Sequence, residues 1–168
     1  MAKSAYDIAP DATFIEAAHT SLRQQLEEMM TNLPGTRAGD DIEALHDMRV
    51  ASRRLRAALS VFAAAFPPRP FAVTEKEVAK TTDALGAVRD SDVQIEFMES
   101  VIEKAPESEK VGLRAFVEHL QRERDRERVL LVKELNRLEK SDFVKDFHKL
   151  LGIEDEKFAD GKDGKTHG

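Results

Sequence analysis

Apolar residues recur every three or four positions along most of the chain, which is the spacing of one face of an α-helix. This period, together with residues that typically start and stop helices, predicts six helical segments. Their expected limits are about 11–32, 41–65, 74–86, 90–105, 107–138 and 141–152. Because the breaks between them are short, we expect an all-α fold, an antiparallel helical bundle of five to six helices.

Proline, glycine and capping residues set the expected ends. Asp11 is predicted to cap the first helix, and the proline-rich run 66–70 to stop the second. Thr74-Glu75-Lys76-Glu77 has the pattern of a capping box that opens the third helix, which Gly86 then closes. Asp90 or Ser91 is predicted to cap the fourth helix. This places Arg89 in a tight turn between two helices.

One domain covering residues 11–151 is expected, since 168 residues suffice for a single sizeable core. The flanking segments 1–10 and 152–168 are expected to be flexible, the second because it is polar and rich in Gly, Lys and Asp. No signal peptide or membrane span is predicted, so we expect a cytoplasmic protein. The absence of cysteine excludes disulfides, thiol catalysis and cysteine-ligated metals.

Charge is distributed unevenly along the chain. The net charge is −6, yet residues 48–74 contain five arginines and neither Asp nor Glu. At about 100° per residue, His46, Arg49, Arg53 and Arg56 share one helix face, separate from an apolar stripe that can dock on a core. Guanidinium groups bind phosphate oxygens in a bidentate manner and stay charged at any relevant pH. The face therefore predicts an oxyanion ligand, with phosphate as the favoured one.

Two segments together resemble the signature of CHAD domains, the conserved-histidine α-helical domains. They are His46-Asp47-Met48-Arg49-Val50-Ala51-Ser52-Arg53-Arg54-Leu55-Arg56 and Leu85-Gly86-Ala87-Val88-Arg89-Asp90-Ser91-Asp92-Val93. The resemblance implies an all-helical domain that binds inorganic polyphosphate along a basic groove and has no catalytic activity. It also implies an association with polyphosphate granules or with polyphosphate-metabolising enzymes as partners. No cofactor and no metal are expected.

The candidate polyphosphate-binding residues come from two sources. The resemblance implies His46, Arg49, Arg53, Arg54, Arg56 and Arg89. Helix geometry adds Lys80, Arg124, Arg128 and His19. Arg124 falls within an apolar seam, where a charge needs a partner or a wet cavity, so an ion pair with Asp83 or Glu96 is an alternative to lining the groove.

The chain holds one copy of a helical repeat that usually occurs twice in CHAD domains. A symmetric homodimer would bring two identical basic helices together and rebuild the pair. Dimerisation is therefore expected as one way to complete the groove, the others being a fragment or a short relative with a shallower groove.

Other functions also fit parts of the pattern. The arginine row could be a solvated helix face paired with neighbouring carboxylates. A histidine phosphotransfer module would use His46 as phosphoacceptor, but the sequence shows no nucleotide-binding loop. A nucleic-acid binder is less favoured, because no aromatic residues alternate with the basic ones. An enzyme acting on polyphosphate would need a carboxylate cluster or a nucleophile in the basic segment, and neither is evident.

Overall fold

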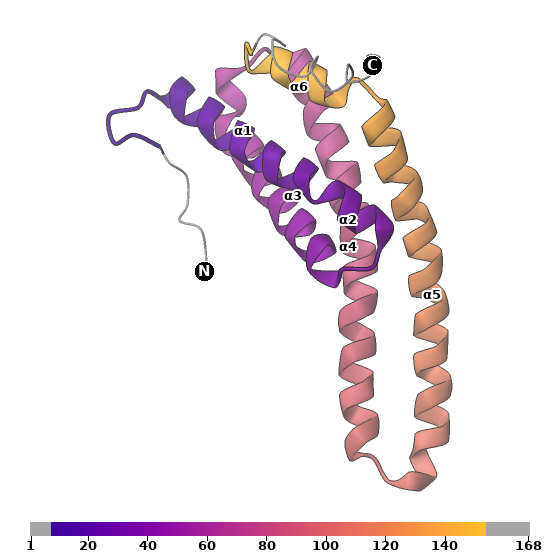
Figure 1. Cartoon of the computed structure of the whole chain (residues 1–168). Coiled ribbons are helices and arrows are strands. Elements are labelled where there is room, and N and C mark those ends of the chain that lie inside the picture. The colour runs from indigo at the N-terminus through magenta and orange to yellow at the C-terminus, as the bar shows by residue number, and fades with distance from the viewer. Residues whose placement is uncertain (1–7, 154–168) are drawn as a thin grey trace, which may run out of the picture.

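The computed structural model describes residues 8–153, which form six α-helices and one short 3-10 turn (Figure 1). In chain order these are α1 (Phe14–Thr31), α2 (Leu33–Ala38), α3 (Ile42–Phe62), η1 (Ala63–Ala65), α4 (Pro68–Lys104), α5 (Glu107–Lys140) and α6 (Phe143–Leu150). No strand occurs between residues 8 and 153. The predicted all-α bundle is confirmed. The outer parts of the predicted flexible termini, residues 1–7 and 154–168, lie outside the described residues.

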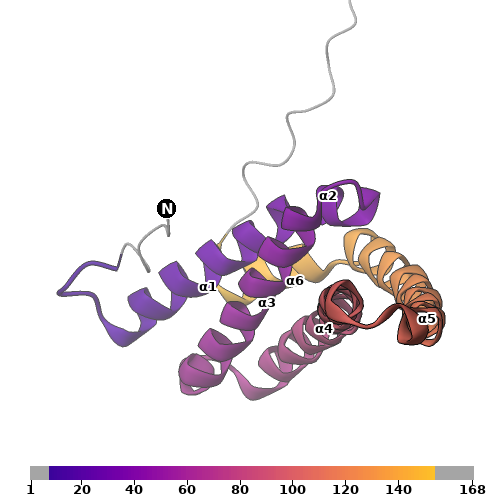
Figure 2. The same cartoon turned by 90° about the horizontal axis from the view of Figure 1, so that it is seen from below.

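Helices α4 and α5 form a long antiparallel hairpin on which the other helices are assembled. Figure 2 shows α3 between α1 and α4, with α5 on the other side of α4. Helices α1, α2 and α3 lie along one half of the hairpin, whereas its other half projects beyond them (Figure 1). None of the helices described between residues 8 and 153 combines the length and apolar character needed to cross a membrane.

The main core lies where α1, α3, α4, α5 and α6 meet. Its fully buried side chains include Leu22, Met48, Leu55, Leu85, Leu131 and Phe147. A separate small cluster of Ile95, Val117 and Leu120 holds the projecting half of the hairpin together. Burying one large apolar side chain contributes about 1.5–3 kcal/mol, so the main core fixes α3 firmly against α4.

The predicted start of the third helix is wrong. Helix α4 begins at Pro68, not Thr74. Proline suits the first helical position because its fixed φ is helical. The N–H that proline lacks would have no partner inside the helix at this position. Pro70 is tolerated for the same reason. The Thr74 hydroxyl is buried and donates to the Pro70 carbonyl at 3.1 Å instead of capping.

The predicted break after Gly86 is also wrong. Helix α4 runs through it without interruption, so Arg89 is in mid-helix and neither Asp90 nor Ser91 is a cap. Glycine costs a helix only about 1 kcal/mol relative to alanine. Packing of α4 against α3 and α5 on both sides of Gly86 exceeds this cost.

Three smaller differences concern helix ends. Thr13, not Asp11, caps α1, in a capping box with Glu16. The predicted break after residue 32 contains the short helix α2. Helix α5 extends to residue 140, slightly beyond its predicted end. The expected start of α3 is confirmed, since the Asp41 carboxylate accepts from the Glu43 N–H at 2.9 Å.

Ion pairs join α4 to α5 beside the core. Arg137 Nη2 of α5 lies 2.5 Å from Glu77 Oε2 of α4 and, within α5, 2.7 Å from Glu134 Oε1; Arg124 of α5 also pairs with Asp92 of α4. Burial raises the pKa of Glu77, but hydrogen bonds from Arg137 and Lys80 outweigh it and leave the pKa below its usual value. A carboxyl whose pKa is lowered on folding stabilises the fold above its unfolded pKa, and this stabilisation is lost as the pH falls through the lowered value.

Arg137→Met is therefore expected to lower the free energy of unfolding by about 1 kcal/mol at pH 7. The difference from wild type should shrink as the pH falls from 4.5 through the lowered pKa of Glu77. Urea denaturation at pH 7 and at acid pH measures it. Arg122→Met is the control, because Arg122 makes no side-chain ion pair within residues 8–153. An equal loss at both pH values would assign the effect to packing instead.

Candidate anion-binding groove

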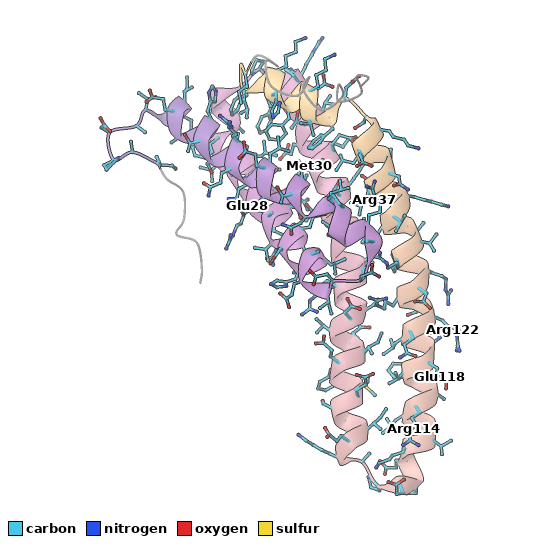
Figure 3. All side chains as sticks on the ribbon, viewed as in Figure 1. Glu28, Met30, Arg37, Arg114, Glu118 and Arg122 are labelled. Carbon is cyan, nitrogen blue, oxygen red and sulfur yellow. The ribbon has the colours of Figure 1, made fainter. Side chains whose placement is uncertain are left out.

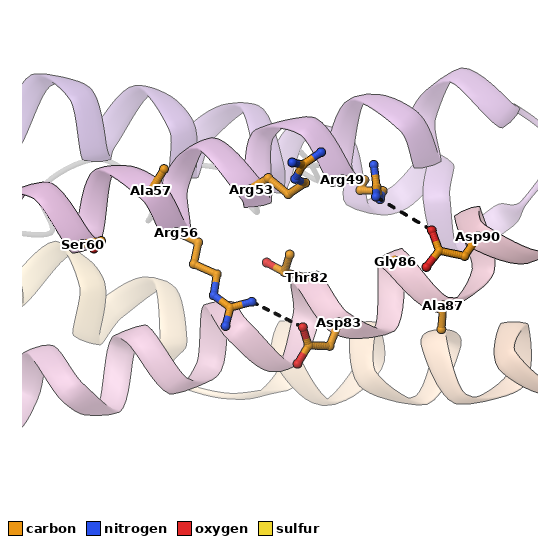
Figure 4. Close-up of a pocket in the computed structure, with 10 residues that line it drawn as sticks. All are labelled: Arg49, Arg53, Arg56, Ala57, Ser60, Thr82, Asp83, Gly86, Ala87 and Asp90. Atoms are coloured by element: carbon orange, nitrogen blue, oxygen red, sulfur yellow. Dashed lines mark hydrogen bonds and ion pairs between the residues drawn. The ribbon is translucent and has the colours of Figure 1, made fainter. Parts of the chain in front are cut away.

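The arginine row of α3 lines an open groove between α3 and α4 (Figure 4). Arg49, Arg53 and Arg56 are four and three residues apart and so project from one side of the helix. The opposite side of α3 carries Met48 and Leu55, which are fully buried in the main core. The docking of that apolar side holds the three guanidinium groups at the rim of the core. The groove has a volume of about 680 Å³.

Small and polar side chains form the rest of the groove. They are Ala57 and Ser60 of α3 and Thr82, Asp83, Gly86, Ala87 and Asp90 of α4. Gly86 is of particular interest, because a Cβ atom added there would meet nothing within 4 Å. Helix packing does not require glycine at this position. Its lack of a side chain leaves the floor of the groove open.

Two arginines of the groove face carboxylates across it (Figure 4). Arg56 Nη1 lies 3.4 Å from Asp83 Oδ1, and Arg49 Nη2 lies 4.0 Å from Asp90 Oδ1. The Asp side chains are 74 % and 72 % exposed, so each pair contributes at most about 1 kcal/mol. Arg53, between the two pairs, makes no ion pair within residues 8–153. The groove thus presents one unpaired and two weakly paired guanidinium groups to a ligand.

Four other predicted site residues belong to α3 and α4 but do not line the groove. His46 is exposed one turn before Arg49, whereas Arg54 is exposed on another side of α3, about 140° from Arg49 and about 160° from Arg56. Lys80 pairs with Glu77 at 3.2 Å on α4. Arg89 is half-buried in the middle of α4, with Nη1 3.7 Å from Glu96 Oε1. None of these four is among the residues that line the groove.

Arg124 and Arg128 of α5 are engaged elsewhere. Arg124 bonds to the buried carboxylate of Asp92, in the interface between α4 and α5. The predicted alternative of an ion pair for Arg124 is therefore confirmed, but its predicted partners are wrong. Asp83 and Glu96 pair with other arginines. Arg128 donates to the carbonyls of Thr36 and Arg37 at 2.9 and 2.7 Å and so satisfies the end of α2. Both side chains hold helices together.

Gly39 permits the Arg128 contact. It has a φ of 79°, and a Cβ atom there would collide with the Arg128 guanidinium group. His19, the last predicted site residue, stacks on Phe66 with a centroid distance of 5.9 Å. It belongs to the end of the bundle where α1 meets the segment after α3, not to the groove.

Sequence reasoning missed the α4 wall of the groove. Asp83 and Asp90 are seven residues apart, with Gly86 and Ala87 between them, and on an unbroken helix these four share one face. The predicted break at Gly86 concealed this pattern. Within residues 8–153, no group of three or more His, Asp or Glu side chains is placed to hold a metal ion.

The chain was compared with protein-family models and with curated proteins. A protein-family model described as the CHAD domain matches residues 20–166, which is most of the chain. The match includes all of α3, α4 and α5. A comparison with curated proteins gives no match.

Gly86→Ala is expected to raise the free energy of unfolding by about 0.5–1 kcal/mol, because alanine favours the helix and its methyl group meets open space. Gly112→Ala in α5 is the matched control, since a Cβ atom there also meets nothing within 4 Å. Thermal denaturation should show similar increases for both variants. A decrease for Gly86→Ala alone would mean that α3 closes over the groove.

Proposed function

The chain belongs to the CHAD-domain family, and from this premise we propose that it binds inorganic polyphosphate, or a similar linear polyanion, in the groove between α3 and α4. CHAD domains are linked in general to polyphosphate binding. The proposed binding is non-catalytic, so the ligand leaves the groove unchanged. Arg49, Arg53 and Arg56 are its principal contacts.

The row of three arginines on one wall carries this proposal. Arg49 and Arg56 are seven residues apart, which corresponds to about 10 Å along a helix, with Arg53 between them. A single phosphate ion reaches only part of this distance. A chain of linked phosphates can contact all three guanidinium groups in sequence through charge-assisted hydrogen bonds. The spacing therefore favours a linear polyanion over isolated phosphate.

Asp83 and Asp90 add a competitive element. A ligand that takes both Arg49 and Arg56 must displace two weak, exposed ion pairs. A polyanion displaces both in one binding event, whereas separate phosphate ions each lose translational freedom. The aspartates thus strengthen the preference for a chain of phosphates.

The remaining predicted cations take different parts in this proposal. His46, Arg54, Lys80 and Arg89 lie on the two helices that form the groove and add to its positive potential without lining it. Arg124 and Arg128 position α5 through their contacts with Asp92 and the end of α2. His19 stacks on Phe66 and so contributes to the packing of α1. Polyphosphate-metabolising enzymes are the protein partners that this activity favours.

Polyphosphate fits the groove better than a nucleic acid does. The residues that line it include no aromatic side chain on which a base could stack.

The test is calorimetric titration with long-chain polyphosphate over a salt series. The Arg49→Ala, Arg53→Ala, Arg56→Ala triple variant is expected to bind at least about 100-fold more weakly, because each lost charge-assisted contact contributes about 1.5–3 kcal/mol before competition from the aspartates is subtracted. The slope of log affinity against log salt should also become shallower.

A second triple variant controls for net charge. Arg114→Ala, Arg122→Ala and Arg126→Ala remove the same charge from α5, where Figure 3 shows Arg114 and Arg122 on the projecting hairpin. This control should retain wild-type affinity at moderate salt. Equal losses of affinity in the two triple variants would show that the binding is nonspecific electrostatic attraction. This result would contradict the proposed groove. Circular dichroism verifies that both variants keep their helicity.

A further inference from the structure

Beyond the groove, the same side of α4 carries exposed apolar side chains. Val93 and Phe97 are 46 % and 64 % exposed, and Val101 is half-buried. At about 100° per residue these three positions lie within about 80° of one another, on the side of α4 that also carries Asp90. The part of α4 that follows Asp90 runs into the half of the hairpin that α1, α2 and α3 leave uncovered (Figure 1).

This stripe is symmetric about Phe97 except for the charges at its ends. Val93 lies four residues before Phe97 and Val101 four residues after it. Asp90 lies seven residues before and Lys104 seven residues after, so one end is acidic and the other basic. Lys104 is exposed and makes no ion pair within residues 8–153. Such a stripe is complementary to itself when the second copy runs in the opposite direction.

We propose that two copies of this chain pair through the stripe, with their α4 helices antiparallel about a two-fold axis at Phe97. In this arrangement Val93 packs against the partner subunit's Val101, and Asp90 faces the partner subunit's Lys104. Each contact occurs twice, as an isologous interface requires. The hairpin projects beyond the rest of the molecule (Figure 1), so this arrangement places the two main cores at opposite ends of the dimer.

The pairing would also change the groove, a consequence that rests on the proposed function. Asp90 lines the groove and is only loosely held, at 4.0 Å from Arg49. The partner subunit's Lys104 would draw Asp90 away from Arg49 and add a cation at that end. The two Asp90 positions would lie about 21 Å apart along the paired helices. A long polyanion could then follow both arginine rows across the interface.

Sedimentation equilibrium of the full chain tests the dimer directly. Wild type is expected to dimerise, and Phe97→Glu to be monomeric, because the substitution places two like charges together on the axis. Val111→Glu is the matched control, since Val111 is 74 % exposed on α5 and lies off the stripe. It should remain dimeric. A monomeric wild type, or a Phe97→Glu variant that dimerises like wild type, overturns the inference.

A charge exchange tests the register. Lys104→Asp should weaken the dimer about tenfold, because it replaces an attraction by a repulsion at both ends of the stripe. Combining it with Asp90→Lys exchanges the two charges and should restore dimerisation. A double variant weaker than Lys104→Asp alone would contradict the antiparallel register. Restoration cannot result from misfolding, so the pair of variants remains informative if a single variant is unstable.

Cross-linking adds a geometric readout, since the chain contains no cysteine. Phe97→Cys places two thiols at the axis, and oxidation should yield a disulfide-linked dimer. Val111→Cys should yield only background cross-linking, and equal yields would refute the axis. A dimer that does not bind polyphosphate would contradict the proposed function alone. A monomer that binds it tightly would contradict this inference alone.

Discussion

The docking of the apolar side of α3 into the main core is the constraint on which the candidate site depends. Met48, Leu55 and Leu59 are fully buried, and α3 packs against both α1 and α4. A helix held in this way cannot rotate without exposing them, which would cost several kcal/mol. The opposite side of α3 is therefore fixed at the edge of the core. Arg49, Arg53 and Arg56 acquire their common direction from this packing and not from contacts with one another.

The second wall of the groove depends on the continuity of α4. Because α4 does not break at Gly86, Asp83 and Asp90 face the arginines at matching intervals, seven residues on each helix. The carboxylates limit repulsion among the guanidinium groups in the free protein, yet their exposure leaves them weakly bound. In the free protein the aspartates thus neutralise part of the charge of the arginines. A multivalent anion can displace these carboxylates.

Elements set by the apolar period could be predicted from the sequence, whereas those decided by packing could not. The period locates α3, its arginine face and the long helix α5, because these depend on spacing alone. The predicted boundary at Gly86 is wrong, since a locally weak position remains helical when neighbours pack on both sides of it. The boundary at Thr74 is wrong because the prolines before it begin the helix and do not end the preceding one. Arg124 has the partner that its place in an apolar seam requires. That partner is Asp92, which follows directly after the helix start predicted at Asp90 or Ser91 and lies in the middle of α4 instead.

Three particular guanidinium groups carry the proposed function, and NMR can observe them individually. The measurement is a titration with polyphosphate of defined length, followed through the arginine side-chain Nε–Hε signals. The signals of Arg49, Arg53 and Arg56 are expected to shift together and to saturate at one common affinity. Those of Arg124 and Arg128 should stay in place, because Asp92 and the end of α2 already hold them. Shifts spread evenly over the exposed arginines of α5, with those of α3 no larger, would contradict binding in the groove.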